Sequence, residues 1–456
     1  MDSQSWIAIA VVFYCATVIA VAYFVFVVRK SNLFDPIGQY LFFLSLFSLP
    51  LPIRALLTEE IEGSVTPYLP TLMHYLPISL ALTALSMPLF TLGYYSPWAR
   101  RVARATPIPM RQPPERLGLA FMVLIGLSVL LLYLLTSEAG GFVPFLLLGY
   151  SSTEQTFGRG YLAVGLPWLF VASLFLLYGY SRTRSMRYLV SFIVALGGVV
   201  LIQLLIGNRA MLLYILLVVM IYVHYGIRPL RWKFLVPFAL AVFLSLNVMG
   251  TLRGSGYENI GDFIEKTTAS AERVSQDEAK NFFYTLTIGE FVVPFETLPQ
   301  MVRTIGIEDV PWFGLSYIRA PIYLIPNFLF PDRPLPLASW YMERYYGGGL
   351  RLNEGRQFFF LAEAYLNFGP AGIIIVALFW GVLWGALRQW LARSELHPAA
   401  VLIYALSVGF MFRCIAGDFA TLVAGVTQQS LAAALIGLLI AGGTLRRRAP
   451  PERAPA

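Results

Sequence analysis

Arginine is the residue type whose placement in this sequence points to chemistry. Several arginines lie beside or within strongly apolar segments, where an arginine at membrane depth costs about 2.5–3.5 kcal/mol even on a lenient insertion scale. The guanidinium group stays charged and donates paired hydrogen bonds to phosphate oxygens. A group of such side chains on one face would suit a lipid-linked phosphate or pyrophosphate. The arginines are Arg209, Arg253, Arg319, Arg333, Arg351, Arg356 and Arg413.

A simpler explanation applies to each of these arginines. An arginine at a helix end commonly extends to water or to lipid headgroups and does nothing else. Arg209 fits that explanation poorly, because it stands in a short Gly-Asn-Arg-Ala turn that restricts its reach. Arg319 also fits poorly, because apolar residues flank it in a proline-rich segment. These two arginines are therefore the strongest candidates for a phosphate clamp.

The composition defines the kind of structure that must position them. Of the 456 residues, 58% are hydrophobic and 13% are charged, and the mean hydropathy is +0.69. A soluble domain carries about 45–50% apolar and about 25% charged residues, so a water-soluble enzyme is excluded. Two cysteines exclude a disulfide scaffold, and the hydrophobicity excludes a disordered chain. The chain is predicted to be an all-α polytopic membrane protein.

Eleven apolar runs are long enough to cross a bilayer, which requires roughly 20 residues per helix. Alternating strands of the kind that build membrane barrels are absent from the pattern. The predicted spans are 6–28, 37–57, 69–95, 117–136, 161–180, 188–206, 210–227, 234–250, 365–390, 398–415 and 422–443.

Basic residues predict the orientation of these spans. Nineteen of the 33 lysines and arginines fall on one set of connections, which the positive-inside rule places in the cytoplasm. The N-terminus is then outside and the C-terminus inside. These basic connections also account for the net charge of +8, so the charge does not indicate a nucleic-acid partner. The nineteen residues are Arg29, Lys30, Arg100, Arg101, Arg104, Arg111, Arg116, Arg182, Arg184, Arg187, Arg228, Arg231, Lys233, Arg388, Arg393, Arg446, Arg447, Arg448 and Arg453.

One outer connection is much longer than the others. We expect an N-terminal bundle of eight spans over 1–250, a large outer loop over 251–364, a bundle of three spans over 365–445 and a basic tail over 446–456. Within the loop, 257–283 suits a surface helix and 340–357 a mobile segment. The stretch 311–331 is apolar but holds four prolines, which kink a helix. We interpret it as a re-entrant or interfacial segment over a cavity.

Other kinds of chemistry have little support. No acidic residue lies at the middle of a span, which disfavours ion-coupled transport. No CxxC, HExxH or clustered Asp/His pattern occurs, so we expect neither a metal nor another cofactor. The three histidines, His74, His224 and His397, have no such partners and are expected to be structural.

Three motifs give the sequence a family resemblance. The GNRA turn (207–210), the IPNFLFP run (325–331) and EAYLNFGPAG (363–372), together with the large outer loop, resemble the O-antigen polymerase family. These enzymes polymerise oligosaccharide repeat units in bacterial envelopes. The resemblance implies a GT-C-like glycosyltransferase architecture and transfer of a glycan from polyprenyl pyrophosphate to another lipid-linked repeat. It implies a site on the outer face of the inner membrane. Related ligases tend to carry a histidine in the outer loop, and this loop has none, which favours a polymerase.

The resemblance and the residues suggest roles for individual side chains. Arg209 and Arg319 would stabilise the growing negative charge on the leaving pyrophosphate. An acceptor hydroxyl needs a base, and Glu363 is the first choice among Glu290, Glu354, Glu363 and Asp418, although it could equally pair with a loop arginine. The wider pyrophosphate and glycan set is Arg209, Arg253, Arg319, Arg333, Arg351, Glu354 and Arg356.

The expected partners follow from this chemistry. They are a polyprenyl-pyrophosphate-linked oligosaccharide as donor and acceptor, membrane lipids, and a chain-length regulator and a flippase. The product would be a surface polysaccharide such as the O-antigen of lipopolysaccharide or an exopolysaccharide. Three alternatives stay open: a glycan ligase, in which His74 would serve; a lipid-linked oligosaccharide flippase or exporter; and a non-catalytic component of an assembly complex.

Overall fold

The computed structural model describes residues 3–57, 69–109, 116–149, 152, 159–230, 257–276, 292–326, 328–346, 357–442 and 445–446. Within them the chain is almost entirely helical, as predicted. One two-stranded antiparallel pairing joins β1 (Ile108–Pro109) to β2 (Leu445–Arg446).

Among the described residues, ten helical segments are long and apolar enough to cross a membrane. Each matches a predicted span to within a few residues, so ten of the eleven predicted spans are confirmed as helices. The predicted eighth span, 234–250, lies outside the described residues. The ten are Ser3–Val28, Pro36–Leu57, Met73–Tyr94, Leu117–Ala139, Gly160–Thr183, Met186–Ile206, Arg209–Gly226, Pro370–Arg393, Pro398–Ile415 and Phe419–Ile440.

Several spans are built from more than one helical piece. In the first half of the chain the pieces are α1 (Ser3–Ala22), the π-helix η1 (Tyr23–Val28), α2 (Pro36–Ser48), α3 (Pro50–Leu57), α4 (Leu69–Leu72), η2 (Met73–Tyr75), α5 (Leu76–Tyr94), α6 (Pro97–Ala105), α7 (Leu117–Thr136), η4 (Ser137–Ala139), α8 (Phe142–Leu147), α10 (Gly160–Ala163), α11 (Gly165–Thr183), α12 (Met186–Ile206) and α13 (Arg209–Gly226).

The second half contains the loop helices and the last three spans. They are α15 (Ile260–Gln276), α17 (Val293–Thr304), α18 (Leu315–Arg319), the 3₁₀-helix η6 (Ala320–Leu324), α19 (Leu337–Tyr346), α20 (Phe360–Phe368), α21 (Pro370–Arg393), α22 (Pro398–Val408), α23 (Met411–Ile415), α24 (Phe419–Ala424), the π-helix η7 (Gly425–Leu431) and α25 (Ala432–Ile440).

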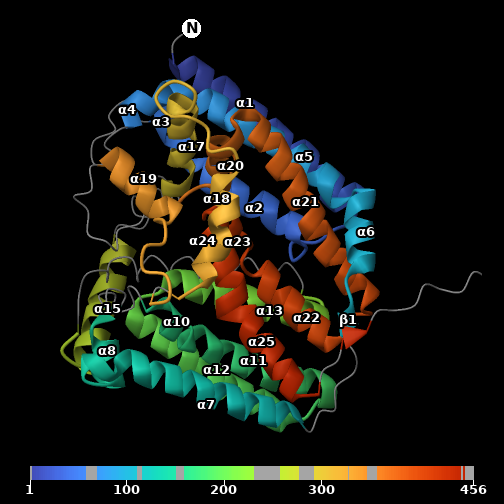
Figure 1. The fold of residues 1–456 in the computed structure, drawn as a ribbon, viewed down its shortest axis with the longest axis vertical. Helices are drawn as coiled ribbons and strands as arrows, with labels where there is room; N and C mark the ends of the chain where they lie inside the picture. The colour runs from blue at the N-terminus through green and yellow to red at the C-terminus, as the bar shows by residue number, and fades with distance from the viewer. Residues whose placement is uncertain are drawn as a thin grey trace, which may run out of the picture.

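The C-terminal spans pack among the N-terminal ones (Figure 1). Helix α21 lies along α5 and α6, while α25 lies against α7 and α11. Glycines allow the α5–α21 crossing to be very close: a β-carbon at Gly93 would collide with the Leu378 carbonyl, and one at Gly381 with the Phe90 carbonyl. Small residues at such crossings let two backbones approach, which drives helix association in membranes.

The described parts of the long connection over 251–364 are largely helical. The expected surface helix corresponds to α15, and residues 277–283 of the predicted 257–283 lie outside the described residues. Residues 340–346, expected to belong to a mobile segment, form the second part of α19 instead; 347–356 lie outside the described residues. The proline-rich stretch is broken into α18 and η6, which pack against α24.

The ninth membrane-spanning helix begins later than predicted. The sequence predicts one helix from residue 365, but the helix is interrupted at Gly369, whose backbone has φ 58° and ψ −148°. The helix resumes at Pro370, whose missing N–H is no loss in a first turn. Glu363 and Asn367 therefore lie on a separate short helix, α20, ahead of the membrane-crossing α21.

The orientation predicts the result of reporter fusions. Fusions after Arg104, Arg184 and Arg447 should report the cytoplasm, and fusions after Glu59 and Ala271 the outside, because basic connections stay on the cytoplasmic side. Alkaline phosphatase and fluorescent-protein activities measure this directly. A cytoplasmic result at Ala271 would contradict the orientation, since the large loop would then lie inside.

Candidate functional site

Glu363 lies at the centre of a buried polar cluster where the loop meets the bundle. It is 1% exposed. Its Oε1 accepts a hydrogen bond from the Ser316 hydroxyl at 2.6 Å, and its Oε2 accepts one from the Phe419 N–H at 2.7 Å. The carboxylate thus joins α18, α20 and the first turn of α24. Its hydrogen-bond partners among the described residues are neutral.

Asn367 completes this cluster from one turn further along α20. Its amide nitrogen donates to the Ser316 hydroxyl at 2.7 Å and to the Glu363 carbonyl at 2.8 Å. The N–H groups of Trp312 and Phe313 donate to the carbonyls of Leu366 and Asn367. The broken segment is therefore held against α20 by both side-chain and backbone bonds, which fixes the direction in which α18 leaves it.

A second buried carboxylate lies beside the first. Asp418 is 2% exposed and caps α24 by accepting a hydrogen bond from the Thr421 N–H at 2.7 Å. The backbone of Ala338, in α19, also donates to it. Asp418 therefore fastens α19 to the same corner, and the loop helices α18 and α19 both meet α24 there.

Burial raises the pKa of both carboxyl groups. For Glu363 the Asp418 charge raises the pKa further, while the hydrogen bonds from Ser316 and Phe419 oppose the shift. For Asp418 burial is again the main cause, opposed by its backbone hydrogen bonds. Two neighbouring buried carboxylates resist ionising together. The pair consequently holds a proton to a higher pH than a carboxyl group in water does.

Two of the predicted arginines lie near this pair, around Tyr323. The pKa of Tyr323 is raised by burial and by the charges of Asp418 and Glu363, and lowered by those of Arg333 and Arg319. The Arg333 guanidinium lies 5.6 Å from the centre of the Tyr323 ring. Arg319 is half-buried, and neither arginine forms an ion pair with a described carboxylate.

Arg209 lies on a different helix, α13, which is linked to η6 through η7. It is the first residue of α13, directly after Gly207 at φ 75° and Asn208, which caps the helix by accepting from the Met211 N–H. In the same helix Tyr214 bonds to Ser430 of η7 at 2.6 Å. Gln428 of η7 donates to the Leu324 carbonyl of η6 at 2.9 Å. The tight turn before Arg209 is as predicted. The π-helix η7 therefore contacts both α13, which begins with Arg209, and η6, which follows Arg319.

The other residues predicted for the site either lie outside the described residues or have different surroundings. Arg253, Arg351, Glu354, Arg356 and Glu290 lie outside the described residues. Arg413 is half-buried, with its guanidinium 5.8 Å from the centre of the Phe410 ring. His74 is exposed and its Nδ1 lies 3.1 Å from the Ser3 hydroxyl.

Ser316, Asn367 and Tyr317 were not singled out from the sequence. The four-residue spacing of Glu363 and Asn367 places both on one face of a helix, and could have identified Asn367. Tyr317 packs between Phe368 and Phe419. Its buried hydroxyl has no hydrogen-bond partner among the described residues. Nothing local indicates that Ser316 would meet a residue 47 positions away.

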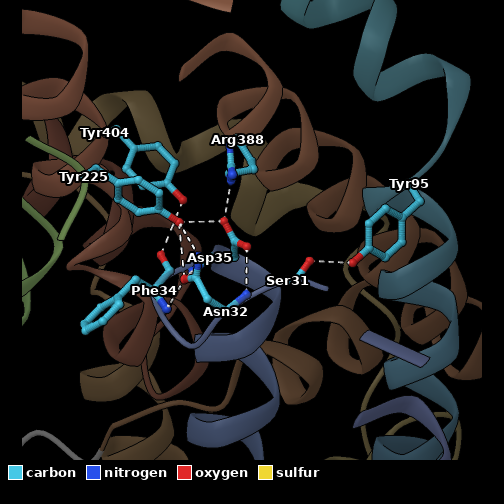
Figure 2. A network of polar contacts seen from close by, with 8 residues as sticks. All are labelled: Ser31, Asn32, Phe34, Asp35, Tyr95, Tyr225, Arg388 and Tyr404. Carbon is cyan, nitrogen blue, oxygen red and sulfur yellow. Dashed lines mark hydrogen bonds and ion pairs between the residues drawn. The ribbon is translucent and has the colours of Figure 1, made fainter. Parts of the chain in front are cut away.

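A second polar network lies at the opposite end of the bundle (Figure 2). Asp35 accepts hydrogen bonds from the Asn32 N–H at 3.0 Å and the Tyr225 hydroxyl at 2.8 Å, and forms an ion pair with Arg388. From the sequence, Arg388 is predicted only to be one of the basic residues that set the orientation of the spans. It lies in α21, whereas Asp35 precedes α2, so their contact could not be found from spacing.

Within the described part of the chain, no group of three or more histidine, cysteine or acidic side chains is arranged to hold a metal ion. Comparisons with protein-family models, curated proteins and solved structures found no match to this chain.

Proposed function

We propose that this protein is a polymerase that joins polyprenyl-pyrophosphate-linked oligosaccharide repeats into a surface polysaccharide on the outer face of a bacterial inner membrane. One observation carries the proposal. Arg319 directly precedes η6, which carries Tyr323 and packs against the helix α24 that Asp418 caps, and the Arg333 guanidinium lies 5.6 Å from the Tyr323 ring centre. Cations for a phosphate and a carboxyl group for proton transfer thus occupy one corner of a multi-span bundle.

The arginines would act on the leaving group. In the transfer, the acceptor hydroxyl oxygen forms a bond to the anomeric carbon of the donor, and the bond from that carbon to the pyrophosphate oxygen breaks. The electron pair leaves with the lipid pyrophosphate, whose charge grows. Guanidinium groups already in position stabilise that charge without reorganising. Arg319 and Arg209 are the proposed clamp, and Arg333 lies near Tyr323.

Glu363 would receive the proton from the acceptor hydroxyl. A base must lie within hydrogen-bond reach of that hydroxyl, and the Ser316 hydroxyl occupies Oε1 now. The acceptor hydroxyl would replace Ser316 as donor to the same oxygen. Because burial and Asp418 raise the pKa of Glu363, the carboxylate is a stronger base than one in water, which favours proton transfer.

The main alternative is a lipid-linked oligosaccharide exporter, a protein that moves the same substrate without joining it. A substrate path through the bundle would call for polar groups along its length. The ten described candidate spans instead hold a single carboxylate, Glu138 at the end of the fourth, while Glu363 and Asp418 lie just outside them. This distribution favours a reaction at one face over passage through the bundle.

The length of the surface glycan in a deletion strain tests the proposal. Loss of a polymerase should leave single repeats on the surface lipid, because export and attachment continue while chain extension stops. Gel separation of the glycan measures this, with the wild-type gene restored as control. Complete absence of surface repeats would indicate an exporter or a ligase, and unchanged long chains would contradict all three functions.

A further inference from the structure

A basic pocket of about 410 Å³ opens at the end of the bundle that is predicted to face the cytoplasm. It lies between the loop that follows η1, the α5–α6 turn and the last turns of α21. Four cations line it, against one carboxylate. The charged residues are Arg29, Lys30, Arg100, Arg388 and Asp35.

The network in Figure 2 builds the wall of this pocket. Asp35 is 3% exposed, and its charge is already paired with Arg388. The Asn32 side-chain oxygen accepts from the N–H groups of Phe34 and Asp35, at 2.8 and 3.1 Å. The Ser31 hydroxyl is 2.9 Å from that of Tyr95. The loop is thus ordered in advance, which lowers the entropy lost when a ligand binds.

The other three cations are left to face the pocket. Arg29, Lys30 and Arg100 are exposed, and none pairs with a carboxylate among the described residues. The Arg29 guanidinium stacks over the Tyr95 ring at 4.5 Å from its centre. Since Asp35 neutralises only Arg388, the pocket presents an excess of positive charge that attracts an anion.

Its surroundings indicate the source of that anion. The helix α6 begins beside the pocket, and its Trp98 is 63% exposed with Arg101 stacked on the ring. Tryptophan next to arginine is typical of the membrane–water interface. Phe26, Leu33 and Gly38, in and beside the loop that follows η1, border an apolar groove of about 470 Å³ between α1 and α2. The pocket therefore lies where charged headgroups meet acyl chains.

We propose that this pocket binds the phosphate group of an anionic phospholipid of the inner leaflet. Arg100 and Arg29 supply planar donors that match two phosphate oxygens, and Lys30 supplies a further charge. This site is separate from the corner around Glu363 and does not depend on the proposed polymerase activity, because its ligand is a lipid of the bilayer and its readout is binding.

Titration of the full-length protein in a neutral detergent tests the proposal. The probes are short-chain phosphatidylglycerol, short-chain phosphatidylcholine and sodium phosphate at equal ionic strength, and the readout is the shift in thermal unfolding midpoint. Phosphatidylglycerol should raise the midpoint more than phosphatidylcholine does. Each basic residue near an anionic lipid contributes about five-fold in affinity, so Lys30→Gln with Arg100→Gln should weaken phosphatidylglycerol binding roughly 25-fold.

Arg104→Gln is the matched control, because Arg104 is an exposed arginine of the same helix α6 that does not line the pocket. It should bind phosphatidylglycerol like the wild type. The unliganded midpoints show whether each variant folds. Equal stabilisation by phosphatidylglycerol and phosphatidylcholine, or equal binding by the double variant and the wild type, would overturn the proposal. Stabilisation by sodium phosphate alone would support phosphate recognition but overturn its assignment to a lipid.

Discussion

Replacing Arg319 with alanine should abolish long-chain polymer while leaving the protein folded and inserted. The half-buried guanidinium forms no ion pair with a described carboxylate, so its removal should break none within that part of the chain. In the proposed reaction it stabilises charge that develops on the leaving pyrophosphate. Removing one such donor costs about 10²–10³ in rate. Chain length in a complemented deletion strain, with the membrane content of the variant protein, measures both parts.

Lysine at position 319 separates this role from simple anchoring. Lysine keeps the charge but loses the planar pair of donors, so Arg319→Lys should restore polymer only weakly. Arg209→Ala and Arg209→Lys should behave in the same way. Arg104→Ala, an exposed arginine of α6 at the other end of the bundle, is the control and should retain long chains. Full activity in Arg319→Lys would indicate that Arg319 only anchors the chain at lipid headgroups. Normal chain lengths in both Arg319→Ala and Arg209→Ala would contradict the proposed pyrophosphate clamp.

Replacing Asp35 with alanine should destabilise the protein more than any single surface change. Three donors lose their acceptor at once: the Asn32 N–H, the Tyr225 hydroxyl and the Arg388 guanidinium. Breaking a buried ion pair from one side costs about 3–5 kcal/mol. The Arg388 side chain is 29% exposed, and water can solvate part of its charge, so we expect the lower end of that range. The apparent midpoint of thermal unfolding in detergent measures the loss.

A second variant shows whether the uncompensated charge is the cause. Asp35→Ala combined with Arg388→Met removes both charges and should recover part of the stability, because no unpaired guanidinium remains. Glu343→Ala, which changes an exposed acid of α19, is the control and should leave the midpoint nearly unchanged. A double variant as unstable as Asp35→Ala alone would assign the loss to the hydrogen bonds of Asn32 and Tyr225 instead.

Length and hydropathy alone predicted the membrane-spanning helices. A bilayer offers no partners for backbone N–H and C=O groups, so an apolar run of about 20 residues must form a helix. Length and apolar content were therefore sufficient to predict ten described spans. The same local information predicted the tight turn at Arg209 and the break in the proline-rich stretch, because glycine and proline act through their own backbone geometry.

The pairing of polar groups depends on helix packing that the sequence does not reveal. Ser316 contacts Glu363 across 47 residues, Phe419 reaches the same carboxylate across 56, and Asp35 pairs with Arg388 across 353. Helical periodicity gives the face on which a side chain lies but not the helix that packs against it. Those partners depend on which helices cross closely, as α5 and α21 do at Gly93 and Gly381. A buried polar group must then find its hydrogen bonds wherever that packing places a donor or acceptor.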